Sequence, residues 1–244
     1  MIEVRNLHKR FGDVVAVDDV SFSAADGVVT GLLGPNGAGK TTTLRMLTTL
    51  IEPDRGAALI DGEDVMRDPI AARRRIGVLP DARGLYPRLT AREHVRYAAE
   101  LHGLERKRVE ERTQELIDLL DMRSIADRRT DGFSHGERVK VALARALVHD
   151  PRNVLLDEPT NGLDVMSTRA VRELIRGLRA QGRCVLFSSH VMQEVSALCD
   201  RIVVIARGRV VADGTPDELR QRGGSDNLEE AFVRIIGSDQ GLSR

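Results

Sequence analysis

A glycine-rich octapeptide, Gly34-Pro-Asn-Gly-Ala-Gly-Lys-Thr41, constrains this sequence more than any other stretch. It satisfies the G-x-x-x-x-G-K-[ST] pattern of a phosphate-binding loop at every position. The apolar run at 28–33 is typical of a buried strand, and residues 42–47 carry apolar side chains at helical spacing. Because the pattern lies between a strand and a helix, it predicts nucleotide binding rather than a glycine-rich turn that happens to include a lysine.

The residue types of this loop explain how it would hold a nucleotide. Gly34, Gly37 and Gly39 let the backbone curl so that successive N–H groups point at one phosphate chain. Lys40 would reach the β- and γ-phosphates, and Thr41 would offer its hydroxyl to Mg²⁺. A helix that begins at Lys40 directs the positive end of its dipole at the same anion.

Two later strands end in polar side chains. Asp157 and Glu158 close a buried strand, where Asp157 would hold Mg²⁺ through water and Glu158 would polarise the water that attacks the γ-phosphate. Alone, a strand that ends in Asp-Glu-Pro is often only a turn, but after a phosphate loop we favour the functional interpretation. His190 follows the strand at 185–189 and could hydrogen-bond the γ-phosphate, although a lone histidine is usually structural.

Two other positions have both a structural and a functional interpretation. Ser134 and Glu137 have the spacing of a capping box, which predicts a helix that begins near Gly136. A serine hydroxyl and the bare N–H groups of a helix start also form an anion site, which could cap a γ-phosphate held by another subunit. Capping and binding can coexist, so both interpretations stay open.

Phe11 precedes Gly12 between two strands and either packs in the core or at an edge, or stacks on an adenine.

The remaining pattern indicates an α/β chain with a helical insertion. Strand and helix signals alternate on both sides of a helical stretch at about 90–148, which opens with a capping box at Thr90. Valines 15, 17 and 20 alternate with polar residues and predict, with residues 2–8, antiparallel strands of a half-buried sheet. A hairpin is predicted at 203–212 and a helical tail at about 215–236, with the last eight residues loose.

Composition narrows the possible partners. The chain of 244 residues has 37 Lys+Arg and 37 Asp+Glu, so no bulk charge attracts nucleic acid or acidic lipid. Aromatic residues make up 3% and Trp is absent, which argues against a stacking platform for nucleic acid. The start lacks the apolar core of a signal peptide, no run approaches the roughly 20 apolar residues of a bilayer span, and Cys184 and Cys199 show no disulfide pattern. We expect a cytoplasmic protein that reaches a membrane only through a partner.

The order of these motifs resembles the ATP-binding subunit of ABC transporters. The phosphate loop is followed by Ser-x-Gly-x, Leu-Leu-Asp-Glu, Gly-Leu-Asp and Ser-Ser-His, and the resemblance covers residues 1 to about 220. It implies an α/β fold: a P-loop NTPase core, with a RecA-like mixed sheet and an antiparallel β subdomain, plus an inserted α-helical subdomain. The implied division is a nucleotide-binding domain at 1–222, with the helical subdomain at about 84–148, and a short helical tail at 223–244.

The resemblance also implies a head-to-tail homodimer with ATP at the interface. Each site would pair one chain's phosphate loop with the other chain's signature at 134–137, and the loop at 161–164 would cross the dimer. Glu158 is then the catalytic base and His190 the switch histidine. Mg²⁺ is assigned to Thr41, Asp157 and Asp81. The nucleotide is assigned to Phe11 as the adenine-stacking aromatic and to Gly34, Pro35, Asn36, Gly37, Ala38, Gly39, Lys40, Thr41, Thr42, Ser134, Gly136, Glu137 and Asp164.

Two positions depart from the usual pattern of the family. The signature is Phe-Ser-His-Gly-Glu instead of Leu-Ser-Gly-Gly-Gln, but Ser134 and Gly136, which face the phosphate, are kept, so we expect it to work. Asp81 stands where the family usually has a Gln that senses Mg²⁺ and relays to the membrane partner. An Asp can accept from a metal-bound water but adds negative charge near the phosphates, so its direct contact with Mg²⁺ stays open.

Within the family, residues 80–92 and 133–153 are similar to the sodium-export (NatA-type) group of ABC-2-like exporters. This similarity implies an ATPase subunit on the inner face of the cell membrane that powers a separate permease, docked near residues 81–103, in sodium efflux. Alternatives are an exporter of drugs or other small molecules, and a soluble ABC-type ATPase that acts on DNA or ribosomes. The latter usually has long coiled coils or a second nucleotide domain, which this sequence lacks. A regulator without turnover is disfavoured by the intact Lys40, Asp157, Glu158 and His190.

Overall fold

A mixed sheet of six strands forms the centre of the computed structural model, which describes residues 1–81 and 84–239. Its strand order is β10-β9-β3-β8-β7-β6, parallel from β9 to β6 and antiparallel at the β10 edge. The bounds are β3 (Val29–Leu33), β6 (Ile76–Leu79), β7 (Asn153–Asp157), β8 (Cys184–Ser189), β9 (Arg201–Ala206) and β10 (Arg209–Gly214). Every residue of β3, β7 and β8 is buried, as expected for parallel strands that are covered on both faces.

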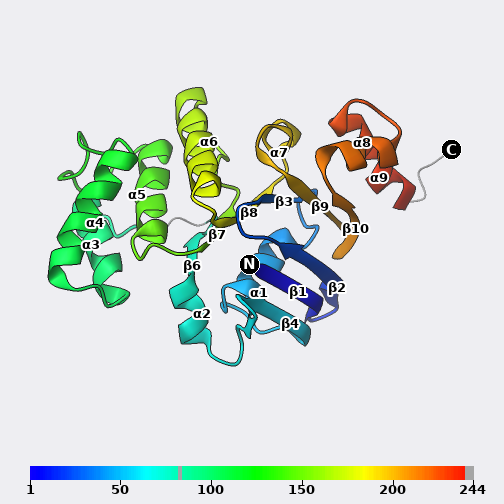
Figure 1. The fold of residues 1–244 in the computed structure, drawn as a ribbon, viewed down its shortest axis with the longest axis horizontal. Coiled ribbons are helices and arrows are strands. Elements are labelled where there is room, and N and C mark those ends of the chain that lie inside the picture. The colour runs from blue at the N-terminus through cyan, green and yellow to red at the C-terminus, as the bar shows by residue number, and fades with distance from the viewer. Residues whose placement is uncertain (82–83, 240–244) are drawn as a thin grey trace.

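Alternation along these buried strands divides the core into two clusters. Leu32, Leu155 and Leu186 pack on the side of the smaller sheet and of α1 (Lys40–Leu47). Leu33, Leu156 and Val185 face the other side, which is covered by α6 (Val165–Ala180) and α7 (Met192–Leu198). The two layers lie on opposite sides of the central sheet in Figure 1. Successive side chains of a strand point to opposite faces, so one apolar run serves both clusters.

An antiparallel sheet of order β2-β1-β4-β5 lies against α1. Its strands β1 and β2 confirm the predicted antiparallel pair. Its bounds are β1 (Ile2–Phe11), β2 (Val14–Ala24), β4 (Arg55–Ile60) and β5 (Glu63–Asp64), and α2 (Pro69–Arg75) follows. Val17 and Val20 are buried, but Val15 is 43% exposed. A bulge explains this exception, because Lys9 pairs with Val17 while the next residue, Arg10, pairs with Val15.

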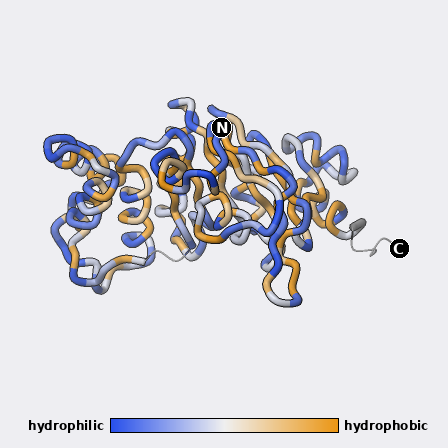
Figure 2. The backbone as a smooth tube through the Cα atoms, turned by 90° about the horizontal axis from the view of Figure 1, so that it is seen from below, coloured by the Kyte–Doolittle hydropathy of each residue, from blue (hydrophilic) through white to orange (hydrophobic). Residues whose placement is uncertain are grey.

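The inserted helical segment consists of α3 (Ala91–Leu101), α4 (Arg106–Leu119) and α5 (His135–Leu147), drawn green in Figure 1. Both predicted capping boxes are confirmed, at Thr90 with Glu93 and at Ser134 with Glu137. The alternation of apolar and polar stretches along these helices is visible in Figure 2. The P-loop core with an inserted helical subdomain, predicted from the sequence, is therefore the observed fold.

The C-terminal tail forms two helices, α8 (Pro216–Gly223) and α9 (Leu228–Asp239), which pack on each other and on β10. The prediction that the last eight residues are loose is wrong for 237–239, because α9 continues to Asp239; residues 240–244 lie outside the described residues. Ile235 and Ile236 are buried in the larger core cluster and hold this helix in place. The division at residues 222 and 223 falls in the last turn of α8, so it stays a proposal. Within residues 1–81 and 84–239, no helix is long and apolar enough to cross a membrane.

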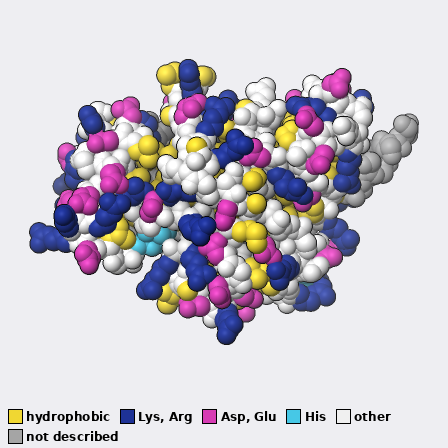
Figure 3. All heavy atoms as spheres, in the orientation of Figure 1, with side chains coloured by type: hydrophobic (Ala, Val, Ile, Leu, Met, Phe, Trp, Pro, Cys, Tyr) yellow, Lys and Arg dark blue, Asp and Glu magenta, His cyan; other side chains and the backbone are white. Residues whose placement is uncertain are grey.

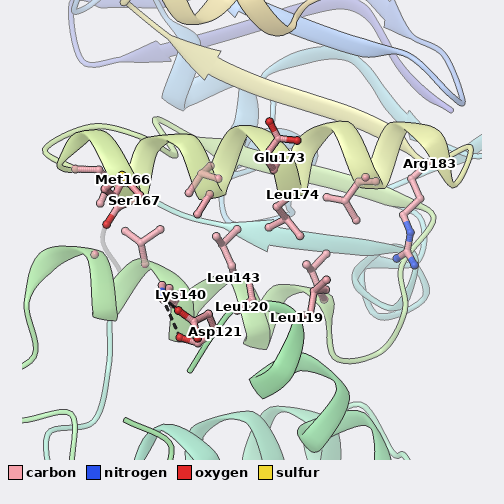
Figure 4. A pocket seen from close by; sticks show the side chains of 18 of the residues that line it. Leu119, Leu120, Asp121, Lys140, Leu143, Met166, Ser167, Glu173, Leu174 and Arg183 are labelled. Atoms are coloured by element: carbon pink, nitrogen blue, oxygen red, sulfur yellow. Dashed lines mark hydrogen bonds and ion pairs between the residues drawn. The ribbon is translucent and has the colours of Figure 1, made fainter. Parts of the chain in front are cut away.

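A groove with a volume of about 580 Å³ separates α6 from the end of α4 and from α5. Figure 4 shows Leu143 and Leu120 on one side of the groove and Leu174 and Met166 on the other. The helical segment also makes contacts with the central sheet. Gly77 in β6 provides one, because a Cβ there would lie 2.2 Å from the carbonyl oxygen of Ala146 in α5.

We predict that Gly77→Ala destabilises the protein by about 1–3 kcal/mol, because its methyl group would overlap the α5 backbone. Gly177→Ala is the matched control, since a Cβ at this α6 position meets no atom within 4 Å. The control should gain about 0.5–1 kcal/mol from higher helix propensity. Urea unfolding of both variants measures the free energies of unfolding; a Gly77→Ala variant as stable as the original chain would contradict the close packing of β6 on α5.

Candidate functional site

The phosphate loop and the ends of two neighbouring strands line one cavity of about 400 Å³. Three parallel strands, β3, β8 and β7, are adjacent in the sheet, so their carboxyl ends meet at one edge. This edge brings together most of the residues predicted for the phosphates, the metal and the water. The lining consists of Ala16, residues 36–42, Asp81, Glu158, Asn161 and His190.

The loop backbone has the shape that its glycines were predicted to provide. Gly37 and Gly39 have φ values of +80° and +107°, and a Cβ on Gly39 would lie 2.5 Å from the carbonyl oxygen of Ala16. Ala38 supports the curl, because its N–H donates to Pro35 and its carbonyl accepts from Gly208. Helix α1 begins without a side-chain cap, so its first N–H groups remain available to an anion.

Lys40 is buried beneath the loop, with 5% of its surface exposed. Its Nζ donates to the carbonyl oxygens of Gly34 at 2.7 Å and Pro35 at 3.2 Å, and lies 3.6 Å from Oε1 of Glu158. The ammonium group is therefore held at the cavity wall by backbone acceptors and one carboxylate. A phosphate chain in the cavity would replace these acceptors with stronger charge-assisted ones.

Two of the predicted metal ligands, Thr41 and Asp157, lie close together and present oxygen atoms. Thr41 Oγ1 lies 3.4 Å from Asp157 Oδ1, which also accepts from Ser188 Oγ at 2.5 Å. Burial raises the pKa of Asp157, against the effect of these hydrogen bonds, and the charges of Asp81 and Glu158 raise it further. A cation would relieve this repulsion. No cluster of three or more His, Cys, Asp or Glu side chains suits a metal among the described residues, and Mg²⁺ held by one carboxylate usually takes water and phosphate oxygens as its further ligands.

Glu158 is the most constrained residue of the cavity. Its backbone has a φ of +48°, a conformation that costs a residue with a side chain of order 1–3 kcal/mol. Oε2 of its carboxylate lies 2.9 Å from His190 Nδ1, and its N–H donates to Ser188 Oγ at 3.0 Å. A carboxylate accepts, so the proton of this pair lies on Nδ1 of the histidine. His190 therefore orients Glu158, a contact that the sequence did not predict.

A second buried carboxylate supports this arrangement and was missed from the sequence. Glu194 in α7 is 6% exposed and accepts from Thr160 Oγ1, with Ser189 Oγ at 3.4 Å. Thr160 lies two residues after Glu158, and Ser189 immediately precedes His190. Glu194 thus ties together the two segments that carry the cavity's acid and its histidine. An isolated acid within a helical pattern gives no sequence signal for such a role.

The signature residues lie outside this cavity. Ser134 Oγ accepts from Glu137 N at 3.2 Å, and Glu137 Oε2 accepts from Ser134 N at 2.7 Å. Glu137 also pairs with Arg128 at 3.1 Å. Burial tends to raise the pKa of Glu137, but the hydrogen bonds from Ser134 and the nearby Arg128 outweigh it and lower that pKa. The capping interpretation is confirmed, and a role of Ser134, Gly136 and Glu137 toward nucleotide stays a prediction.

Asp164 and Phe11, which were also predicted to contact nucleotide, lie at the start of α6 and at the end of β1. Asp164 caps α6, accepting from Ser167 N at 2.8 Å and Ser167 Oγ at 2.8 Å, and the backbone hydrogen bond lowers its pKa. Phe11 is 49% exposed at the end of β1, with Lys9 Nζ 5.6 Å from its ring centroid. The same hairpin carries Ala16 into the cavity lining. Both residues are compatible with their predicted roles, which stay predictions.

Comparison with known proteins gives one consistent assignment. Residues 17–161 match the family model described as "ABC transporter". The chain is 44% identical to the "ABC transporter ATP-binding protein NatA" of Bacillus subtilis, over 96% of this chain and 97% of that one. It is 41% identical to the "Nod factor export ATP-binding protein I" of Bradyrhizobium diazoefficiens, over 98% and 76%.

Solved structures give the same picture. "Structure of ATP binding subunit of ABC transporter" is similar with a TM-score of 0.89 and 32% identity, covering 97% of this chain and 99% of that one. A dimeric ATP-binding cassette in a post-hydrolysis state, bound to ADP and Pi, has a TM-score of 0.80 and 25% identity, with coverage of 88% and 98%.

We predict that Glu158→Gln lowers the turnover of nucleotide hydrolysis by about 10²–10⁴-fold, because the amide cannot accept the proton of the attacking water. Nucleotide should still bind, and a nucleotide-bound dimer should accumulate. Glu173→Gln is the matched control, since Glu173 is exposed on α6 and pairs with Arg176. Phosphate release and size-exclusion chromatography measure both effects, and unchanged turnover would remove Glu158 from the role of base.

Proposed function

Because the chain belongs to the ABC transporter family, as an ATP-binding subunit with ATPase activity, we propose that it powers a separate membrane permease in an exporter. The cavity lined by Lys40, Glu158 and His190, with Asp157 in contact with its Thr41, carries this proposal. Lys40 provides a cation for the phosphates, the oxygens of Thr41 and Asp157 could bind a metal, and Glu158 provides an oriented carboxylate for the attacking water. The subunit would act at the inner face of the cell membrane through its permease.

The dimer is the second part of the proposal. Ser134 and Gly136 do not line the chain's own cavity, and a second copy in head-to-tail orientation would bring its signature over the open side. Two ATP molecules would then be held between two phosphate loops and two signatures. The dimeric form of one similar solved structure supports a dimer of this chain.

Each side chain has a distinct task in the proposed reaction. Lys40 would turn from the carbonyls of Gly34 and Pro35 to the phosphates, and Glu158 would accept a proton from the attacking water while His190 fixes its orientation. Mg²⁺, when bound by Thr41 and Asp157, supplies charge neutralisation for the phosphates. Turnover would then separate the two copies, since the contact that closes the dimer is made to the γ-phosphate.

A second surface supports docking of the permease near residues 81–103. A cavity of about 430 Å³ lies beside Pro80 and is lined by Leu50, Leu101, His102 and Arg145, among others. Leu50 and Leu101 are 63% and 70% exposed. Exposed apolar side chains that gather at one hollow are typical of an interaction site. The neighbouring Asp81 would connect this hollow with the nucleotide cavity.

Sodium is the substrate that we propose. This step rests on the similarity of residues 80–92 and 133–153 to the NatA-type group and on the NatA relative from Bacillus subtilis. A Nod factor exporter is almost equally similar, so export of another small molecule is the alternative. For a soluble ATPase that acts on nucleic acid, one would look for a basic surface. Figure 3 shows Lys and Arg side chains interspersed with Asp and Glu on the face in view, which does not favour that alternative.

Co-purification with the native membrane partner, followed by flux measurements in vesicles, tests this function. We expect ATP-dependent sodium movement that stops in the Glu158→Gln variant and persists in Glu173→Gln. Flux of a different compound would overturn sodium as the substrate but would leave the proposed exporter function in place. ATP hydrolysis without any associated membrane protein would favour the soluble alternative.

We predict that Asp81→Gln changes the Mg²⁺ concentration for half-maximal ATPase activity by about 10-fold or more, the effect typical of a residue that orients metal-bound water. Asp131→Gln, on the exposed surface, is the control. Titration of ATPase activity with Mg²⁺ measures the effect. An unchanged Mg²⁺ profile together with impaired coupling to the permease would place Asp81 on the permease side.

A further inference from the structure

His135 makes a contact that neither the phosphate loop nor helix capping requires. It stands between Ser134 and Gly136 as the first residue of α5, and its side chain is exposed. Its Nε2 lies 2.9 Å from the backbone carbonyl oxygen of Asn161. A carbonyl oxygen accepts, so the histidine is the donor and carries its proton on Nε2.

The contact is part of a close approach between two elements. A Cβ on Gly162 would lie 3.6 Å from Cδ2 and Nε2 of His135, so the ring covers this glycine, whose φ is +72°. A Cβ on Gly136 would lie 2.8 Å from Ser167 Oγ, in the first turn of α6. The start of α5 therefore lies directly on the 161–164 loop and the helix that follows it. The imidazole is the side chain that bonds the loop backbone.

Asn161 belongs to the chain's own nucleotide cavity. It lines that cavity with Lys40, Glu158 and His190. Its N–H donates to the carbonyl of Glu158 at 3.2 Å, and Glu158 is the residue with the strained backbone. A displacement of Asn161 thus reaches the backbone of Glu158, the residue that we propose as the base, through one hydrogen bond.

We infer that His135 is a positioning residue that couples the two nucleotide sites of the dimer; this inference rests on the proposed function. Its neighbours Ser134 and Gly136 would contact the ATP held by the second copy. Its own ring holds the loop that adjoins the ATP of its own chain. When the signature is drawn onto the opposite γ-phosphate, the ring carries that movement to Asn161 and sets Glu158 for hydrolysis. Each site would therefore hydrolyse ATP fastest when the other is occupied.

Two substitutions separate the hydrogen bond from simple packing. His135→Leu keeps an apolar side chain over Gly162 but removes the donor, whereas His135→Gln keeps an N–H donor. In the purified full chain, ATPase activity against ATP concentration should give a Hill coefficient above 1 for the original chain and for His135→Gln. His135→Leu should give a value near 1 and a turnover about 3–10-fold lower, the scale of one lost neutral hydrogen bond. The affinity of its monomer for ATP should not change.

A readout without turnover keeps the inference separate from the proposed function. In nucleotide-free protein, amide hydrogen exchange across 159–164 should become faster in His135→Leu but not in His135→Gln. Equal Hill coefficients for the original chain and His135→Leu would overturn the coupling, as would a Hill coefficient of 1 for the original chain. An original chain that hydrolyses no ATP would overturn the proposed function and the coupling with it, while the exchange measurement would still report the contact.

Discussion

The register of three buried parallel strands is the constraint on which the site depends. Ser188 of β8 lies opposite Asp157 of β7, and Ser189 lies opposite Leu33 of β3. The loops that follow these strands therefore open side by side at one edge of the sheet. A slip of one residue would exchange the two core clusters, moving Leu32 and Leu33 to the wrong faces. The apolar core thus fixes where the phosphate loop, the acid pair and the histidine meet.

The charged side chains at this edge are arranged to bind a ligand rather than to stabilise the folded chain. Asp157 is buried, with its pKa raised, beside further carboxylates, and the backbone of Glu158 has a positive φ. Lys40 is held by carbonyl oxygens that a phosphate would outcompete. Such features cost stability and persist because the surrounding structure holds them, which is typical of functional sites. The hydroxyls around Glu194 and Asp157 belong to this surrounding structure.

The features that the sequence predicted correctly have local sequence patterns. The phosphate loop, the capping boxes at Thr90 and Ser134 and the apolar runs of the sheet each depend on residues within a few positions. What it missed depends on distant partners. Val15 is exposed because of a bulge opposite β1, and α9 extends because Ile235 and Ile236 find the core. Glu194 and His135 also contact distant segments, and no local sequence pattern predicts either contact.

The capping box at Ser134 also explains how an acidic signature remains compatible with phosphate. Capping uses the N–H groups of Ser134 and Glu137, so those of His135 and Gly136 remain for an anion. Ser134 Oγ accepts one hydrogen bond in the cap and keeps its own O–H as a donor. The Glu137 carboxylate accepts from Ser134 N and from Arg128, and the guanidinium charge of Arg128 offsets its negative charge. A glutamate at this position strengthens the helix start and still leaves the donors that a γ-phosphate of a second copy would need.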